Sequence, residues 1–212
     1  MTEEELLAEI NRHLPAADWK TGARQYFTNV TKNGVPLERC FAKPFVSLEP
    51  GSPPSALGET VYLLRNYAAV IDILRLPARA RVLDVACGAG WLSHYLAKMG
   101  YQATGVDICA GLIESARARV AEDKWIVVQP QFLVCDVETE APNIQPVDAA
   151  FFESCLHHFW NPVAAVRNVV SRLTESGVIV VMEGEAREGP LKPEYVAEMR
   201  AYHTIERPYT RQ

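Results

Sequence analysis

The sequence predicts an α/β fold, in which helices cover a doubly wound and mostly parallel sheet. Three observations lead to this prediction. Strand-length apolar runs alternate with segments of helical periodicity over about residues 80–206. A glycine-containing turn joins the first run to the helix after it, and acidic residues stand at the ends of several runs. Such alternation implies parallel strands joined by right-handed crossovers.

Residues 1–55 are expected to form an N-terminal extension without a chemical motif. Its apolar spacing and turn residues predict short elements and not a second core. The expected elements are a helix over residues 3–14 ended by Pro15, a hairpin over residues 25–42 around Asn33-Gly34, and a Pro-rich linker at residues 49–54.

Residues 56–212 are expected to form the main domain. It opens with a helix near residues 56–75, for which Ser55 is the expected N-cap. The strands that follow are expected near residues 81–86, 102–107, 131–135, 147–153 and 177–183, and the helices near residues 90–99, 110–122, 162–173 and 193–206.

The first of these strands ends in a small and flexible turn, Cys87-Gly88-Ala89-Gly90. Glycine adds no Cβ and tolerates positive φ, so the backbone N–H groups of such a turn can approach a ligand closely. The helix N-terminus that follows favours the same approach. The turn therefore predicts a ligand-binding loop.

Asp107 ends the second strand, next to this loop. A carboxylate there is well placed to accept hydrogen bonds from both hydroxyls of a ribose, which indicates a nucleoside-containing cofactor. A dinucleotide would require a third glycine, where this chain has Ser93. Asp84, just before the loop, is awkward beside a pyrophosphate and suits a ligand that carries an ammonium group and a positively charged sulfur.

The segment from Leu83 to Gly90 resembles the first motif of the class I (Rossmann-like) S-adenosylmethionine (SAM)-dependent methyltransferase family, acid-x-Gly-x-Gly-x-Gly. Ala86 stands where the family usually has glycine, a departure that narrows the loop. Three later segments resemble the family's third strand, fourth strand with its loop, and fifth strand: residues 132–137, 147–162 and 171–183. The resemblance implies the strand order 3-2-1-4-5. It also implies that the extension is a lid over the cofactor, and a simple cover for the sheet edge is the alternative.

The resemblance implies SAM as the cofactor and S-adenosyl-L-homocysteine (SAH) as its product. Within the implied site, Asp107 is expected at the ribose, Ile108 on the adenine face and Asp136 at the adenine amino group. Glu153 is expected near the methionine ammonium or the acceptor. The full implied set is Asp84, Ala86, Cys87, Gly88, Gly90, Asp107, Ile108, Asp136, Val137 and Glu153.

His157 and His158 are the candidate catalytic residues, as a general base, with a structural role as the alternative. No carboxylate nearby in the sequence completes a ligand set with these adjacent histidines, so no metal site is expected. The reaction that the resemblance implies is an in-line displacement at the methyl group of SAM.

Composition and charge restrict the partners. The net charge is −5 without a Lys/Arg run, so the chain offers no electrostatic footprint for nucleic acid or an anionic membrane. The apolar stretches are too short to span a membrane, and the N-terminus lacks the pattern of a signal peptide. Five cysteines show no paired metal spacing. We therefore expect a cytoplasmic protein that acts on a small-molecule acceptor.

The C-terminal region is shorter than the resemblance implies. The family usually places two more strands beside the fifth, whereas here a single expected helix follows Glu183. An apolar strand at residues 177–183 would then be an open edge, so we expect either a C-terminally incomplete domain or a partner that covers the edge. The alternatives to an active methyltransferase are a non-catalytic SAM-binding module of a larger assembly and a nicotinamide-dependent oxidoreductase, which Asp84 and Ser93 disfavour.

Overall fold

The computed structural model describes residues 3–32, 43–45, 55–183 and 191–207 of the chain. Its centre is a five-stranded sheet in which every pairing is parallel, with the order β3-β2-β1-β4-β5. The strands are β1 (Arg81–Val85), β2 (Gln102–Asp107), β3 (Gln131–Val134), β4 (Val147–Glu153) and β5 (Leu173–Met182). The order is the one that the sequence predicts, and it places the switch point between β1 and β4.

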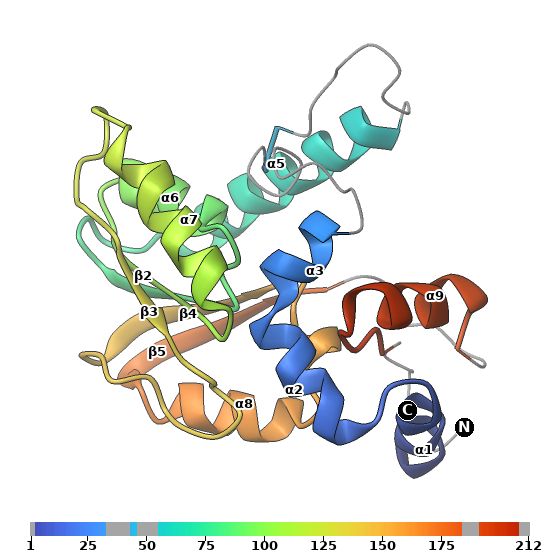
Figure 1. The fold of residues 1–212 in the computed structure, drawn as a ribbon. Helices are drawn as coiled ribbons and strands as arrows, with labels where there is room; N and C mark the ends of the chain where they lie inside the picture. Colours follow the sequence, from blue (N-terminus) through green and yellow to red (C-terminus); the bar gives the residue numbers. More distant parts are fainter. Residues whose placement is uncertain (1–2, 33–42, 46–54, 184–190, 208–212) are drawn as a thin grey trace.

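Helices cover both faces of the sheet, as a doubly wound fold requires (Figure 1). On one face, Val82 and Phe151 pack against Leu92 and Leu96. The helices of this face are α5 (Ser55–Leu74), α6 (Trp91–Lys98) and α7 (Ala110–Ala121). On the other face, the core around Leu83, Val85, Val106 and Phe152 includes Ala165 and Val169 of α8 (Pro162–Val170). Side chains alternate between the faces along β1, so neighbouring residues serve different cores.

A third layer, which we call the cap, lies across the carboxyl ends of the strands (Figure 1). It consists of α1 (Glu3–His13), α2 (Ala16–Arg24), α3 (Tyr26–Lys32), α9 (Pro193–Tyr202) and the segment 203–207 that follows α9. Buried apolar side chains join its two ends, which are far apart in the sequence: Leu6, Ile10, Leu14, Trp19, Leu191, Met199 and Ile205. Tyr26 also packs edge-on against Tyr202, with ring centroids 6.1 Å apart.

The predicted hairpin over residues 25–42 is wrong where the structure describes it. Residues 26–32 form α3, and the Asn33-Gly34 turn lies outside the described residues. The aromatic and β-branched residues of this segment favour strand by intrinsic propensity. Tertiary packing overrides that preference, because Val30 is buried and Phe27 lies against α7 near Gly111.

The fifth strand begins earlier than the sequence predicts. Helix α8 ends at Val170, not at residue 173, and β5 begins at Leu173. The expected glycine turn is a bulge inside the strand: Leu173 pairs with Val147, while Val178 already pairs with Ala149. A Cβ on Gly177 would lie 2.9 Å from the Leu173 Cβ, so the bulge is too tight for a larger residue.

Helix α2 was not predicted from the sequence. The other predicted elements agree with the structure to within a few residues, and α5 begins at Ser55, the expected cap position. β5 forms one edge of the sheet, and its Val178 and Val181 are exposed. Among the described residues, no helix is both long enough and apolar enough to cross a membrane.

Candidate functional site

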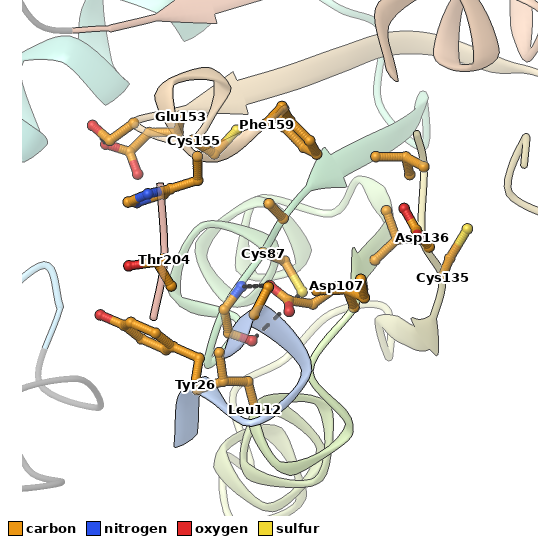
Figure 2. Close-up of a pocket in the computed structure, with 18 of the residues that line it drawn as sticks. Tyr26, Cys87, Asp107, Leu112, Cys135, Asp136, Glu153, Cys155, Phe159 and Thr204 are labelled. Carbon is orange, nitrogen blue, oxygen red and sulfur yellow. Dashed lines mark hydrogen bonds between the residues drawn. The ribbon is translucent and has the colours of Figure 1, made fainter. Parts of the chain in front are cut away.

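A cavity of about 270 Å³ lies where the carboxyl ends of the strands meet the cap (Figure 2). The cap contributes Trp19, Ala23, Tyr26 and Thr204 to its wall. Most of the remaining wall comes from the carboxyl ends of four strands and the segments that follow them, residues 86–89, 106–108, 135–138, 153–155 and 158–159, and Lys43, Trp91 and Leu112 complete it. Parallel α/β sheets bind ligands at this edge.

The loop after β1 turns through three residues with positive φ: Ala86 (52°), Gly88 (53°) and Gly90 (73°). Its two glycines, Gly88 and Gly90, have different structural roles. A Cβ on Gly88 would meet no atom within 4 Å, so the backbone there is open to the cavity. A Cβ on Gly90 would lie 2.8 Å from both the Ala116 Cβ and the Phe132 ring. Gly90 therefore lets α7 and β3 pack closely behind the loop.

Asp107 is held in one orientation at the end of β2 (Figure 2). Its Oδ2 accepts a hydrogen bond from Gly88 N at 2.9 Å, and its Oδ1 accepts one from Cys109 N at 2.8 Å. The side chain lines the cavity although the residue is only 8% exposed. Burial raises the pKa of this carboxyl. The loop and the carboxylate thus form one unit, with lone pairs left for a ligand's hydroxyl groups.

Asp84 and Gly90 do not line the cavity. The Asp84 side chain points to the same face of the sheet as Val82, where it meets the start of α6. Its Oδ2 accepts hydrogen bonds from Ser93 N at 3.0 Å and from Ser93 Oγ at 2.7 Å. Burial raises the pKa of Asp84 to about 7. Asp84 therefore anchors the helix behind the loop, and a direct contact of either residue with a ligand stays a prediction.

The other eight residues of the implied cofactor set all line the cavity: Ala86, Cys87, Gly88, Asp107, Ile108, Asp136, Val137 and Glu153. They come from the loops after β1, β2, β3 and β4, so the structure brings together residues from four separate segments. All pairings in the sheet are parallel, so the carboxyl ends of these strands lie at the same edge.

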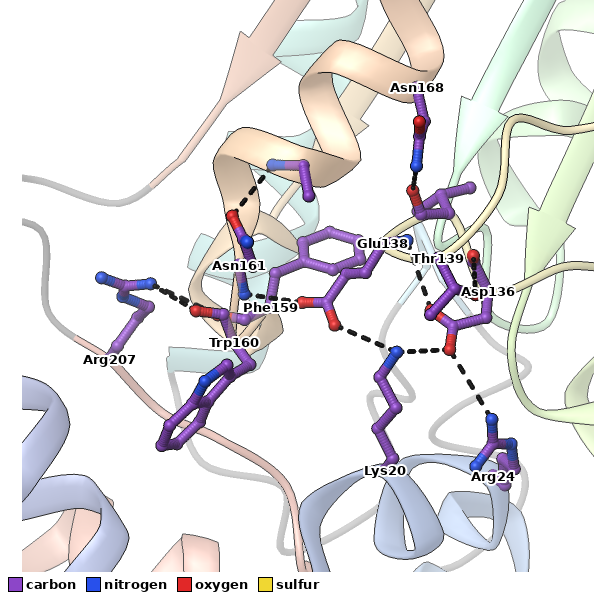
Figure 3. Close-up of polar contacts among 12 residues, drawn as sticks. Lys20, Arg24, Asp136, Glu138, Thr139, Phe159, Trp160, Asn161, Asn168 and Arg207 are labelled. Atoms are coloured by element: carbon purple, nitrogen blue, oxygen red, sulfur yellow. Dashed lines mark hydrogen bonds and ion pairs between the residues drawn. The ribbon is translucent and has the colours of Figure 1, made fainter. Parts of the chain in front are cut away.

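The carboxylates after β3 are paired with the cap (Figure 3). Lys20 of α2 donates to Asp136 Oδ2 and lies 3.4 Å from Glu138 Oε2. Arg24 lies 3.6 Å from the same Asp136 oxygen. Glu138 Oε1 in turn accepts a hydrogen bond from Asn161 N at 2.9 Å. The Lys20 contact could not be predicted from the sequence, because α2 and β3 are distant along the chain.

The two histidines after β4 lie in a 3₁₀ turn (Leu156–His158) and have different surroundings. His158 lines the cavity, whereas His157 does not. His157 Nδ1 lies 2.8 Å from Glu183 Oε2. Glu183 Oε1 accepts hydrogen bonds from Cys155 N and Leu156 N. Burial alone would raise the pKa of Glu183, but these partners outweigh it and lower the pKa.

Glu206, in the segment after α9, faces both histidines. Its Oε1 lies 3.1 Å from His158 Nδ1 and its Oε2 lies 3.7 Å from His157 Nε2. His158 Nδ1 also donates to the Ile205 carbonyl at 2.7 Å. Burial would lower the pKa of His158, but Glu206 and the Ile205 carbonyl raise it. The proximity of Glu206 to the histidines could not be predicted from the sequence, because only the fold brings this residue beside the 3₁₀ turn.

Comparison with known proteins agrees with this architecture. The methyltransferase domain family matches residues 82–177. The ubiquinone biosynthesis O-methyltransferase of Xanthomonas axonopodis pv. citri (strain 306) is 37% identical over 102 residues, which are 48% of this chain and 41% of that protein. The S-adenosyl-L-methionine-dependent Diels-Alderase iccD of Talaromyces variabilis is 31% identical over 130 residues, 59% of this chain and 43% of that protein. The chain thus spans about two-fifths of the length of these relatives.

Solved structures share the fold at low sequence identity. The magnesium protoporphyrin IX methyltransferase (ChlM) of Synechocystis PCC 6803, solved with SAH, has a TM-score of 0.56 and 23% identity, with 74% of this chain and 68% of that chain covered. The [4+2]-cyclase SpnF has a TM-score of 0.64 and 22% identity, with 83% and 64% covered. At these identities the likeness concerns the fold alone.

Proposed function

We propose that this chain, which belongs to the class I SAM-dependent methyltransferases, binds SAM in the cavity and transfers its methyl group to a small-molecule acceptor. The observation that carries the proposal is the Gly88–Asp107 unit. A loop amide and a fixed carboxylate meet there at the ends of two adjacent parallel strands. That arrangement suits the ribose of an adenosine.

The lining residues fit SAM in type and in order. Asp107 keeps free lone pairs for the two ribose hydroxyls, and Ile108 offers an apolar surface for the adenine. Asp136 is a carboxylate acceptor for the adenine amino group. Glu153, with Ser154 Oγ donating to its Oε1 at 2.9 Å, is the carboxylate available to the methionine ammonium. Gly88 leaves the loop open at the point where the ligand approaches.

The residues of the chain contribute binding, alignment and exclusion of water. When bound, SAM supplies a methyl group that its positive sulfur already activates. Trp19, Tyr26 and Phe159 cover the cavity and keep water from the reacting atoms. Holding the acceptor in line with the methyl group can remove about 7–11 kcal/mol of the activation barrier, because the translational and rotational freedom of the reactants is already lost on binding.

His158 is the histidine that we place beside the acceptor, because it lines the cavity while His157 turns to Glu183. The net charge of −5 favours a small acceptor over nucleic acid. We propose that residues 1–55 are an N-terminal extension that serves as a lid over the cofactor and that residues 56–212 form the SAM-binding domain. A cytoplasmic location fits the free thiols of Cys87, Cys109, Cys135 and Cys155.

The test uses the purified chain with methyl-labelled SAM and the small-molecule fraction of a cell extract. The proposal predicts label in small molecules and release of SAH. Calorimetric titration in parallel should show binding of SAM and SAH and not of NAD. Binding of NAD without SAH, or label that enters only protein or nucleic acid, would contradict the proposal.

A further inference from the structure

Two imidazoles and a carboxylate meet at the edge of the cavity. His157, His158 and Glu206 each offer a nitrogen or oxygen atom, and these atoms all lie within 4.8 Å of one another. His157 Nε2 lies 3.7 Å from Glu206 Oε2. Ligand atoms of a tetrahedral zinc ion lie about 3.3 Å apart, because each sits about 2.0–2.1 Å from the metal. A small side-chain adjustment therefore converts this cluster into a ligand set.

His157 is held as metal-ligating histidines usually are. Its Nδ1 faces the Glu183 carboxylate at 2.8 Å and carries the proton, so the lone pair of the ring is on Nε2, the atom that faces Glu206. Metal-bound histidines typically donate their other N–H to a carboxylate or a backbone carbonyl in this way. His158 offers Nδ1, which lies 3.1 Å from Glu206 Oε1 and 2.7 Å from the Ile205 carbonyl. A metal ion at this position would replace the proton that this nitrogen shares with the two oxygen atoms.

The support behind the cluster is itself ordered. Glu183 Oε1 accepts hydrogen bonds from Cys155 N at 2.7 Å and from Leu156 N at 2.6 Å, which ties the carboxylate to the turn that carries the histidines. On the other side, Arg207 N donates to the His157 carbonyl at 3.2 Å and fixes the segment that carries Glu206.

We propose that His157, His158 and Glu206 bind a divalent transition-metal ion such as Zn²⁺. Two imidazoles and one carboxylate suit zinc and its neighbours in the first transition row more than Mg²⁺ or Ca²⁺, which take oxygen ligands. Three protein ligands leave one coordination position open, as in catalytic zinc sites. Because His158 lines the cavity, that position would be available to an acceptor oxygen. This last point rests on the proposed methyl transfer, whereas metal binding does not.

Calorimetric titration of ZnCl₂ into the full chain, stripped with a chelator, tests the site. We expect one equivalent to bind, with affinity at least about 10-fold lower in His157→Gln and in Glu206→Gln. Glu183→Gln should weaken binding by about 10- to 100-fold, because it removes only the partner of a ligand. Glu198→Gln is the matched control: it removes a negative charge that acts on the same three residues but no ligand, so it should lower zinc affinity less than His157→Gln or Glu206→Gln does.

Titration of SAH into the same variants separates this site from the proposed function and identifies any variant that does not fold. Variants that keep the wild-type affinity for SAH and lose zinc support the metal site. Absence of stoichiometric zinc binding by the wild type would overturn it. Zinc affinity that is unchanged in both His157→Gln and Glu206→Gln would also overturn it.

Discussion

The two walls of the cavity are built in different ways. One wall, which we call the loop wall, consists of residues 86–89 and Asp107. It joins Gly88 to Asp107 across 19 residues, at the ends of adjacent strands whose side chains are buried in the core. The cap wall joins Lys20 to Asp136 across 116 residues, through long side chains at the surface. The Lys20 and Asp136 side chains are 23% and 12% exposed. Breaking a buried hydrogen bond of the first kind lowers the free energy of unfolding substantially, whereas a partly exposed ion pair contributes little to it.

This difference separates a rigid element from an adjustable one. The backbone of the loop wall cannot move without breaking the sheet core, so under the proposed function it would set the position of the ribose. The cap wall lines the cavity from the other side, through partly exposed contacts that exchange more readily for water. We therefore expect substitutions in the loop wall to have large effects and substitutions in the cap wall to have small ones.

The largest effect should come from Gly90→Ala. The new Cβ would collide with Ala116 and Phe132 at a residue with φ of 73°. We expect the free energy of unfolding to fall by about 2–4 kcal/mol through overpacking and backbone strain. Urea denaturation measures it. Gly88→Ala is the matched control, since it adds strain but no collision and should cost about 1 kcal/mol. Equal losses in the two variants would contradict the different roles of these glycines.

An effect of similar size, spread over about three pH units, should appear in the pH dependence of stability. Burial raises the pKa of Asp84 from 3.8 to about 7, so between these values the folded state holds a proton that the unfolded chain has released. The free energy of unfolding then falls as pH rises through this window, by up to about 1.4 kcal/mol per pH unit from this group. Above pH 7 the contribution is constant.

Asp84→Asn isolates the contribution of this carboxyl. The amide oxygen still accepts from Ser93, but it no longer titrates. Denaturation midpoints measured from pH 4 to pH 8 should therefore fall less steeply in Asp84→Asn than in the wild type. Parallel curves for the two proteins would show that Asp84 is not the group responsible.

The smallest effect should come from the cap. Lys20→Met keeps the stem of the side chain and removes its charge from Asp136 and Glu138. We expect a loss of at most about 1 kcal/mol of stability, and a smaller loss at high salt because the pair is screened. Urea denaturation at two salt concentrations measures both. Lys98→Met, which removes a comparable pair with Asp123 away from the cavity, is the control. A loss well above 1 kcal/mol would place the cap among the rigid parts.

The loop wall could be predicted from the sequence because its determinants are local. An apolar run, a glycine turn and a terminal acid define β1, the loop and Asp107 within thirty residues of sequence, and the first four strands end within a residue of their predicted positions. The sequence pattern could not assign different roles to residues of the same type, such as the two glycines of the loop or the aspartates that follow the strands. Gly88 faces the cavity while Gly90 packs behind it, and Asp84 accepts hydrogen bonds from Ser93 and does not line the cavity.

The cap could not be predicted in the same way, because its contacts depend on which distant segments meet. The β-branched and aromatic residues of α3 favour a strand until they are packed against α7 and α9. Lys20 and Glu206 are ordinary charged residues in the sequence. Their significance appears only when the fold brings them to Asp136 and to the histidine pair.

The most direct test of the central claim is calorimetric titration of SAH into the wild type and into Asp107→Ala, with Asp72→Ala, a surface carboxylate 80% exposed, as the control. If the Gly88–Asp107 unit binds the ribose, Asp107→Ala should weaken SAH binding by about 1–3 kcal/mol through a lost pair of charge-assisted hydrogen bonds. Asp72→Ala should bind as the wild type does. An unchanged affinity in Asp107→Ala, or no binding of SAH by the wild type, would contradict the account.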